Sequence, residues 1–219
     1  MTIKGLIFDL DGTVTLTQQF HAQSFGEVFK RHGLTFTPAD DARFSGRGAH
    51  CTFPEFFLEH HITLTPEQIE QYCAEKNEVY SRIIKNAHIV AVPGVENFLR
   101  HQRNEGTKVA MATGNRLESA EILLGKVGLQ EFFKIIVTDK DIKNAKPAPD
   151  IFLKAAEKLK LKPEECIVFE DAVNGVLAAK KANMRCIALI TTTPKDSLLE
   201  AGADLLISSY DDLTDIHLE

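Results

Sequence analysis

Two aspartates, Asp9 and Asp11, come directly after the apolar run Leu6–Phe8 and immediately before a Gly-Thr pair. An aspartate carboxylate can attack phosphorus and form an aspartyl phosphate, which divides one difficult transfer into two easier steps. A second carboxylate can protonate the leaving oxygen and later accept a proton from water. Asp and Gly are also typical of turns, so the pair alone fits a turn as well as phosphoryl transfer with Asp9 as the nucleophile and Asp11 as the acid and base.

Two further segments carry residue types that suit the same chemistry. Thr113 offers a hydroxyl in Thr113-Gly114-Asn115, and Asn115 and Glu118 stand in capping-box spacing. The helix that follows is therefore expected to present backbone N–H groups to phosphoryl oxygens. Attack by one anion on another needs charge neutralisation, which Lys146 can supply. We expect Thr113, Gly114, Asn115 and Lys146 to bind the phosphoryl group.

A divalent cation is the second expected source of positive charge. Mg²⁺ takes oxygen ligands and binds through one or two carboxylates together with substrate phosphate. Asp9 and Asp171 suit this role, with Glu170 in support, because Glu170-Asp171 also follows an apolar run. Mg²⁺ is therefore the predicted cofactor. A calcium loop fits poorly, because the DxDxDG-type spacing is absent and Phe20 stands where a ligating Glu is needed.

These residues need a framework that brings them together. Short apolar runs alternate with helical patterns along most of the chain, which indicates βαβ units and an α/β fold with a doubly wound parallel sheet. Ligands bind such sheets outside the carboxyl ends of the strands, where the candidate residues lie. The predicted strands span residues 6–8, 108–113, 134–138, 166–170, 186–190 and 204–208, and the predicted helices span 95–104, 117–127, 150–159 and 173–182.

Residues 17–87 break the alternation, because they show helical periodicity and no convincing buried strand. One helix is expected to begin after Thr65 as N-cap, with Pro66 first and Gln68 completing a capping box. An earlier helix is expected to close at Gly33. A helical insert at this point is placed to act as a lid. The predicted domains are a core of residues 1–16 and 88–219 and a helical cap of residues 17–87.

Composition argues against several classes of function. The 219 residues are 44% apolar, carry a net charge of −6 and contain no Lys/Arg-rich run, so no nucleic-acid or membrane partner is expected. The four cysteines form no CxxC pair, which argues against a disulfide framework or a zinc site. We recognise no signal peptide or membrane span, and a cytoplasmic location is the expectation.

Four ordered motifs give the chain a family resemblance. FDLDGT, MATGN, KPAPDIF and VFEDAVNGVLAAKKAN resemble the nucleophile, Thr/Ser, lysine and acidic motifs of the haloacid dehalogenase (HAD) superfamily. Within it, the chain is similar to the β-phosphoglucomutase-like branch, which has a small helical cap. The resemblance implies a Rossmann-like HAD core and a cap that opens and closes. It also implies that Mg²⁺ is held by Asp9, the backbone carbonyl of Asp11, Asp171 and Glu170.

The resemblance also points to residues of the cap. His21 falls where this branch carries a hinge histidine, and EKNEVYSRII resembles a cap helix that contributes Lys76. The segment RFSGRGAHC lies where the branch has its specificity loop, in which Gly46 and Gly48 would let the backbone approach a ligand. Arg47 in that segment is expected to hold a distal phosphate or sugar. His21, Arg47 and Lys76 are thus the expected substrate-binding residues of the cap.

Differences from the mutase pattern favour hydrolysis over phosphoryl migration. The first motif reads DGT rather than DGV, Ala49 stands where the mutases carry an arginine, and Arg116-Leu117 replaces a Lys-Asn pair. The predicted protein is a Mg²⁺-dependent, monomeric phosphatase that hydrolyses small phosphate monoesters, most plausibly sugar phosphates, through an aspartyl phosphate. A phosphomutase is the alternative within enzymes. A non-catalytic regulator that binds a phosphorylated metabolite is the alternative outside them.

Overall fold

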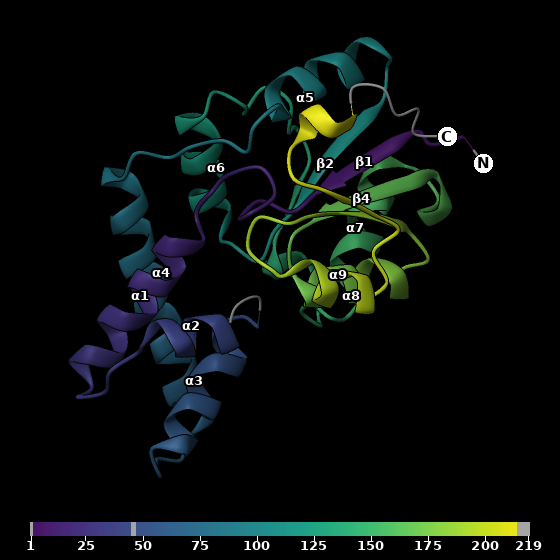
Figure 1. Cartoon of the computed structure of the whole chain (residues 1–219). Helices are drawn as coiled ribbons and strands as arrows, with labels where there is room; N and C mark the ends of the chain where they lie inside the picture. The colour runs from purple at the N-terminus through teal and green to yellow at the C-terminus, as the bar shows by residue number, and fades with distance from the viewer. Residues whose placement is uncertain (1, 45–46, 214–219) are drawn as a thin grey trace. The chain divides into compact units, whose positions relative to one another are not determined.

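The chain divides into two compact units. A computed structural model describes residues 2–44 and 47–213 (Figure 1). The core unit comprises Met1–Thr17 and Ile89–Glu219, and the insert unit comprises Gln18–His88. Among the residues that the model describes, no helix combines the length and the apolar character needed to cross a membrane.

A six-stranded parallel sheet forms the centre of the core unit, in the order β3-β2-β1-β4-β5-β6. The first strand lies in the middle, with Leu6 opposite Val109 on one side and Ile167 on the other. All six predicted strands are present, and the predicted α/β fold class is confirmed. The strands are β1 (Gly5–Phe8), β2 (Lys108–Ala112), β3 (Ile136–Val137), β4 (Cys166–Glu170), β5 (Arg185–Leu189) and β6 (Leu205–Ile207).

Helices cover both faces of this sheet. Alternate residues of a strand point to opposite faces, so Ile7 and Phe8 identify the two layers. Ile7 belongs to a buried cluster with residues of α7, α8 and α9, whereas Phe8 packs against Phe98 of α5 and Tyr210 of η3 (Figure 1). The helices are α5 (Val95–Asn104), α6 (Leu117–Lys126), α7 (Asp150–Leu159), α8 (Val173–Lys181) and α9 (Lys195–Glu200), with 3₁₀ turns η1 (Asp139–Asp141), η2 (Pro163–Glu165) and η3 (Tyr210–Leu213).

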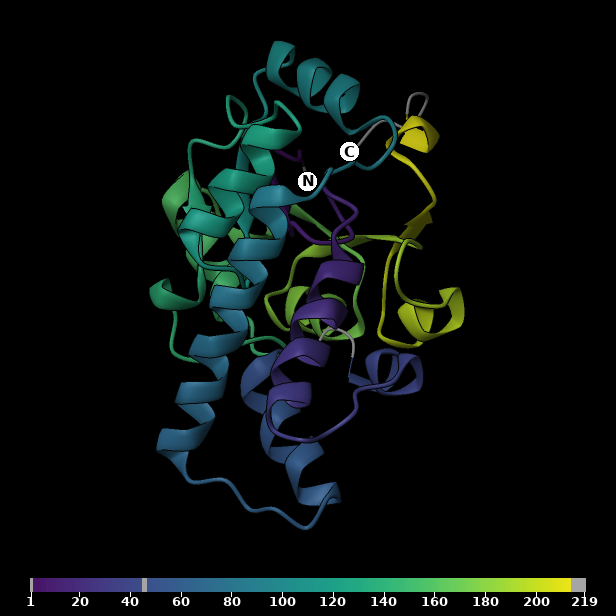
Figure 2. The same cartoon turned by 90° about the vertical axis from the view of Figure 1, so that its left-hand side faces the viewer.

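Four helices make up the described part of the insert unit, and no strand occurs there. Figure 2 shows α1 and α4 running side by side. The expected capping box is confirmed, because Gln68 N donates to Thr65 Oγ1 and Thr65 N donates to Gln68 Oε1. Gly33, at φ 74°, follows the end of α1 as expected. The helices are α1 (Gln18–Arg31), α2 (Pro38–Phe44), α3 (Ala49–Glu59) and α4 (Pro66–Asn86).

The segment 43–51, expected to be a loop, joins two helices. Its first residues end α2, and its last residues begin α3 at Ala49. Gly48 is the N-cap of α3 at φ 73°, a left-handed backbone conformation that favours glycine. Gly46 lies outside the described residues. Pro54 lies inside α3, although proline in a helix interior is costly.

Candidate active site

Asp9 directly follows β1, at the carboxyl end of the strand. Its backbone N–H donates to the carbonyl of Phe169 at 2.9 Å, which holds the residue beside β4. Its Oδ1 accepts a hydrogen bond from Lys146 Nζ at 2.5 Å. Burial raises the pKa of Asp9 to about 7, with Lys146 opposing the rise and the carboxylates of Glu170 and Asp11 adding to it. The carboxylate therefore depends on nearby positive charge for its ionised form.

Lys146 bridges two carboxylates of the site. Besides Asp9, its Nζ donates to Glu170 Oε1 at 2.7 Å. The other oxygen of Glu170, Oε2, accepts the N–H groups of Asp171 at 2.9 Å and Ala172 at 3.0 Å. Burial would lower the pKa of Lys146, but the two carboxylates raise it above its ordinary range and keep the ammonium charged. Both oxygens of Glu170 are thus used to fix Lys146 and the turn after β4.

Asp171 directly follows β4 and is buried. Thr13 Oγ1 donates to its Oδ1 at 3.2 Å, and Thr192 Oγ1 donates to its Oδ2. Burial raises the pKa of Asp171 well above its usual range, and the neighbouring carboxylates of Glu170 and Asp9 raise it further. Asp171 therefore belongs to a cluster in which negative charge is concentrated.

Asp11 is held by two hydrogen-bond donors from different segments. Thr17 Oγ1 donates to its Oδ1, and Asn115 Nδ2 donates to its Oδ2 at 2.6 Å. The backbone N–H of Asn115 donates to Thr113 Oγ1 at 3.1 Å. The loop after β2 thus connects the expected phosphoryl-binding hydroxyl with the expected acid and base.

The capping role expected for Asn115 is wrong. The N-cap of α6 is Arg116, whose side chain makes no capping hydrogen bond. The amide of Asn115 is instead used by Asp11, a partner 104 residues away in the chain. Capping-box spacing describes only local partners, and here a tertiary hydrogen bond takes the side chain. Gly114 remains exposed in the same loop, and a Cβ there would meet nothing within 4 Å.

The acidic cluster suits a divalent cation in its donor chemistry. Among residues 2–44 and 47–213, no three His, Cys, Asp or Glu side chains form a ready-made metal group. Of the expected Mg²⁺ ligands, Glu170 uses its two carboxylate oxygens for Lys146 and for two backbone N–H groups. The carboxylates of Asp9 and Asp171 and the backbone carbonyl of Asp11 remain as oxygen donors, and Mg²⁺ keeps several waters in such sites. Lys146 is a single cation among three neighbouring carboxylates. The excess negative charge and the oxygen donors therefore fit the expected ion.

The substrate residues expected in the insert unit form two separate groups. His21 stacks on Tyr80 with ring centroids 4.1 Å apart, and its Nδ1 lies 2.8 Å from Lys76 Nζ. Lys76 is only 5% exposed. Arg47 forms a bidentate ion pair with Glu55, in which Nη1 donates to Oε1 at 3.0 Å and Nη2 donates to Oε2 at 2.5 Å. Within this unit, Arg47 is therefore already paired with an acid.

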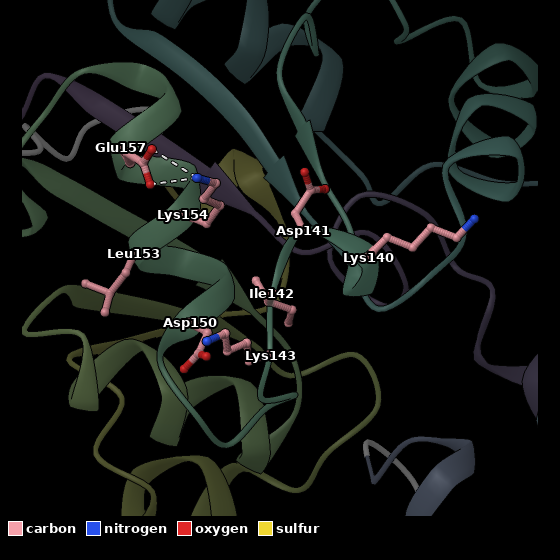
Figure 3. Close-up of a pocket in the computed structure, with 8 residues that line it drawn as sticks. All are labelled: Lys140, Asp141, Ile142, Lys143, Asp150, Leu153, Lys154 and Glu157. Atoms are coloured by element: carbon pink, nitrogen blue, oxygen red, sulfur yellow. Dashed lines mark hydrogen bonds and ion pairs between the residues drawn. The ribbon is translucent and has the colours of Figure 1, made fainter. Parts of the chain in front are cut away.

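A separate cavity of about 500 Å³ lies on the core unit beside α7 (Figure 3). None of the expected site residues lines it, and several of its charges are already paired. Lys154 donates to Glu157 at 2.9 Å, and Asp141 accepts from Lys158 at 2.8 Å. We therefore assign the candidate site to the strand ends. The cavity is lined by Lys140, Asp141, Ile142, Lys143, Asp150, Leu153, Lys154 and Glu157.

Sequence reasoning missed Thr17 and Thr192 as members of the site. Each donates a hydroxyl hydrogen bond to an aspartate of the cluster. Threonines in loops carry no periodicity or motif of their own. The one usable signal was position, because Thr192 follows the predicted strand 186–190 and the carboxyl ends of parallel strands share one edge.

Comparison with known proteins agrees with the fold and identifies the family. Validoxylamine A 7'-phosphate phosphatase of Streptomyces hygroscopicus subsp. limoneus is 29% identical over 97% of this chain and 95% of its own length. Phosphorylated carbohydrates phosphatase of Thermotoga maritima is 30% identical over 94% of this chain and 94% of its own. The crystal structure of β-phosphoglucomutase from Clostridium difficile superposes with a TM-score of 0.84, at 25% identity over 98% of this chain and 94% of that one. The model of the haloacid dehalogenase-like hydrolase family matches residues 3–183, and the chain belongs to that family of hydrolases.

Proposed function

We propose that this protein is a Mg²⁺-dependent phosphatase that hydrolyses small phosphate monoesters, with sugar phosphates as its substrate class. The observation that carries the proposal is the position of Asp9, a strand-end carboxylate held by Lys146 at 2.5 Å in a buried cluster. Lys146 is fixed in turn by Glu170 at 2.7 Å. A nucleophile with a paired cation beside it suits attack on an anionic phosphoryl group.

The reaction proceeds in two steps. The carboxylate of Asp9 attacks phosphorus, the bond from phosphorus to the ester oxygen breaks, and Asp11 gives its proton to the leaving alcohol. In the second step Asp11 takes a proton from water, the water oxygen attacks phosphorus, and the bond from phosphorus to Asp9 breaks. Inorganic phosphate leaves, and both aspartates return to their starting protonation states.

The remaining residues bind and orient. Asn115 and Thr17 hold the Asp11 carboxylate from both oxygens, which fixes the direction of proton transfer. The Thr113 hydroxyl and the exposed backbone of Gly114 bind phosphoryl oxygens. Asp9, Asp171 and the backbone carbonyl of Asp11 would hold Mg²⁺, which when bound supplies positive charge to the phosphoryl oxygens.

We further propose that the insert unit, residues 18–88, covers the substrate and reads its non-phosphate part. His21 and Lys76 form one contact group and Arg47 a second. Replacing Arg47 with Met should raise KM for sugar monophosphates, through lost contacts with the sugar, and leave hydrolysis of a minimal aryl phosphate unchanged. An equal loss on both substrates would contradict a specificity role for Arg47.

A phosphomutase of the β-phosphoglucomutase kind is the second candidate, because the mutase from Clostridium difficile matches this fold over most of both chains. Phosphatase and mutase share the first step and differ in what accepts the phosphoryl group from Asp9. Two features support hydrolysis: Arg47 is ion-paired with Glu55, and position 49, at the start of α3, is an alanine. Around the start of α3, the described residues therefore include no unpaired arginine for a second phosphate.

The test is release of inorganic phosphate from a panel of phosphosugars and related monoesters, with Mg²⁺ and with a chelator. Release that requires Mg²⁺ supports the phosphatase, and the rank order across the panel identifies the substrate class. Conversion of one sugar phosphate isomer into another, with a requirement for a bisphosphate activator and little release of phosphate, would identify the protein as a mutase and contradict the phosphatase proposal. Ligand binding without either reaction would indicate a regulator.

A further inference from the structure

Three consecutive threonines follow β5, and the structure gives their hydroxyls different partners. Thr191 Oγ1 donates to the carbonyl of Gly12 at 2.6 Å, in the turn after Asp9. Thr192 Oγ1 donates to Asp171 Oδ2 and lies 3.3 Å from the Asp171 carbonyl. Thr193 has no side-chain hydrogen bond to any residue that the structure describes. Two of the three hydroxyls are thus hydrogen-bonded, and the third, on Thr193, provides a comparison for experiments on Thr192.

Asp171 receives one hydroxyl donor on each carboxylate oxygen. Thr13 Oγ1 supplies the donor to Oδ1, and the carbonyl of Thr13 accepts from the buried Tyr210 hydroxyl at 3.1 Å. Asp171 itself is 4% exposed. With both oxygens bonded and the side chain buried, rotation of the carboxylate requires breaking one of these bonds.

The close approach of the three segments is built into the backbone. Gly12 has φ 75°, and a Cβ at this position would overlap the Asp171 carboxylate and come within 2.8 Å of Thr192 Cγ2. Only glycine leaves room for the turn after β1, the loop after β4 and the loop after β5 to meet here. The loop carrying Thr192 is therefore part of the site, although no residue of it bears a charge that marks it in the sequence.

We propose that Thr192 is a positioning residue that fixes the orientation of the Asp171 carboxylate for binding of a divalent cation. The proposal rests on the proposed function in taking Asp171 as a cation ligand. Ligating carboxylates are themselves hydrogen-bonded by surrounding groups, and loss of such a partner typically lowers metal affinity about 10-fold to 100-fold. Thr192 acts through Asp171 and touches neither the substrate nor the reacting atoms.

The experiment measures Mg²⁺ affinity by titration calorimetry on the full chain, without substrate. Thr192→Val removes the hydroxyl and keeps the shape, so its Mg²⁺ dissociation constant should rise about 10-fold to 100-fold. Thr192→Ser keeps the donor and should restore affinity. Thr193→Val makes the same chemical change at the unbonded neighbour and should bind Mg²⁺ as the wild type does. Thermal unfolding of each variant verifies that it is folded, and Thr192→Ala replaces Thr192→Val if the latter is not.

The outcomes separate this inference from the proposed function. Unchanged Mg²⁺ affinity in Thr192→Val, or an equal loss in Thr193→Val, overturns the inference while phosphate release by the wild type still supports the phosphatase. Weakened binding in Thr192→Val with rescue by Thr192→Ser supports the inference, even if the wild type releases no phosphate from any ester. A wild type that binds no Mg²⁺ overturns both.

Discussion

Lys146 is the side chain on which the proposed chemistry depends most directly. It lies between the carboxylates of Asp9 and Glu170, at 2.5 and 2.7 Å. Glu170 is almost fully buried, and removing one partner of a buried ion pair is strongly destabilising. The same ammonium group is available to a phosphoryl oxygen beside Asp9. One residue thus stabilises the cluster and serves the proposed reaction.

Replacing Lys146 with Met should lower phosphate release about 100-fold or more, because a positive charge aimed at the transition state is lost. The matched control is Lys154→Met, which removes a lysine that pairs with Glu157 within α7. Steady-state kinetics on the best ester of the panel measures both. Equal rates for the two variants would contradict the role given to Lys146.

Asn115 should act on the chemical step, because its amide holds Asp11 at 2.6 Å. A hydrogen bond to a charged group contributes about 1.5 to 3 kcal/mol, so Asn115→Ala should reduce kcat about 10-fold to 100-fold with little change in KM. Asn86→Ala removes an exposed amide at the end of α4 and is the control. A rise in KM without a change in kcat would assign Asn115 to substrate binding instead.

Residue types at strand ends were predictable, and their tertiary partners were not. The sequence led to Asp9 because it follows an apolar run and to Lys146 because it lies in the KPAPDIF motif, and the structure joins the two directly. It led to a capping role for Asn115 because spacing describes neighbours in the chain. Thr192 escaped notice because a loop hydroxyl acquires its function only from the carboxylate that folding brings to it.

At the scale of elements, α8 packs closely against Glu170 through a glycine. A Cβ on Gly175 would overlap the Glu170 carboxylate, whereas a Cβ on Gly125 in α6 would meet nothing within 4 Å. The glycine in α8 therefore permits a close approach of helix and strand end. Gly125 in α6 makes no such close approach, and a glycine in a helix interior stabilises the helix less than an alanine does.

These two glycines should respond in opposite directions to the same substitution. Gly175→Ala should destabilise the protein by about 1 to 3 kcal/mol through overpacking and lower phosphate release by displacing Glu170 from Lys146. Gly125→Ala should stabilise it by about 0.5 to 1 kcal/mol and leave activity unchanged. Urea unfolding and phosphate release measure both effects. Stabilisation by Gly175→Ala would show that the helix and Glu170 do not pack as described.

Regular elements were predictable where a single rule governed them. Buried parallel strands read as continuous apolar runs, as in Leu6–Phe8, and all three of these residues are fully buried. The capping box at Thr65 was predictable because it needs only local partners. The boundary between α2 and α3 was not predictable, because glycine and proline are both unfavourable in helices, and Gly48 and Pro54 lie at the start of α3 and inside it. The packing of buried phenylalanines stabilises α3 in spite of these two residues.

At the scale of the whole molecule, each unit has its own buried core. Both cores contain cysteines, so the reactivity of these thiols measures how tightly each core is packed. Cys73 in the insert unit and Cys166 and Cys186 in the core unit are buried, whereas Cys51 is exposed. Burial raises the pKa of Cys73 to about 12 and that of Cys166 to about 11. These thiols should therefore resist reagents that attack the thiolate.

Native protein should show one rapidly labelled cysteine and three slow ones, and denaturant should expose all four. Cys51→Ser should remove the rapid phase. A thiol reagent with an optical readout is sufficient for the measurement. Rapid labelling of a second cysteine in native protein would mean that one of the two cores opens more readily than its packing indicates.

The central claim is that Asp9 is the nucleophile of a phosphatase. The most direct measurement compares inorganic phosphate release by the wild type and by Asp9→Asn, both with Mg²⁺ and on the same ester. The account predicts release by the wild type and its disappearance in Asp9→Asn, because an amide in place of the carboxylate cannot form the aspartyl phosphate. Equal release by a folded Asp9→Asn variant would contradict it.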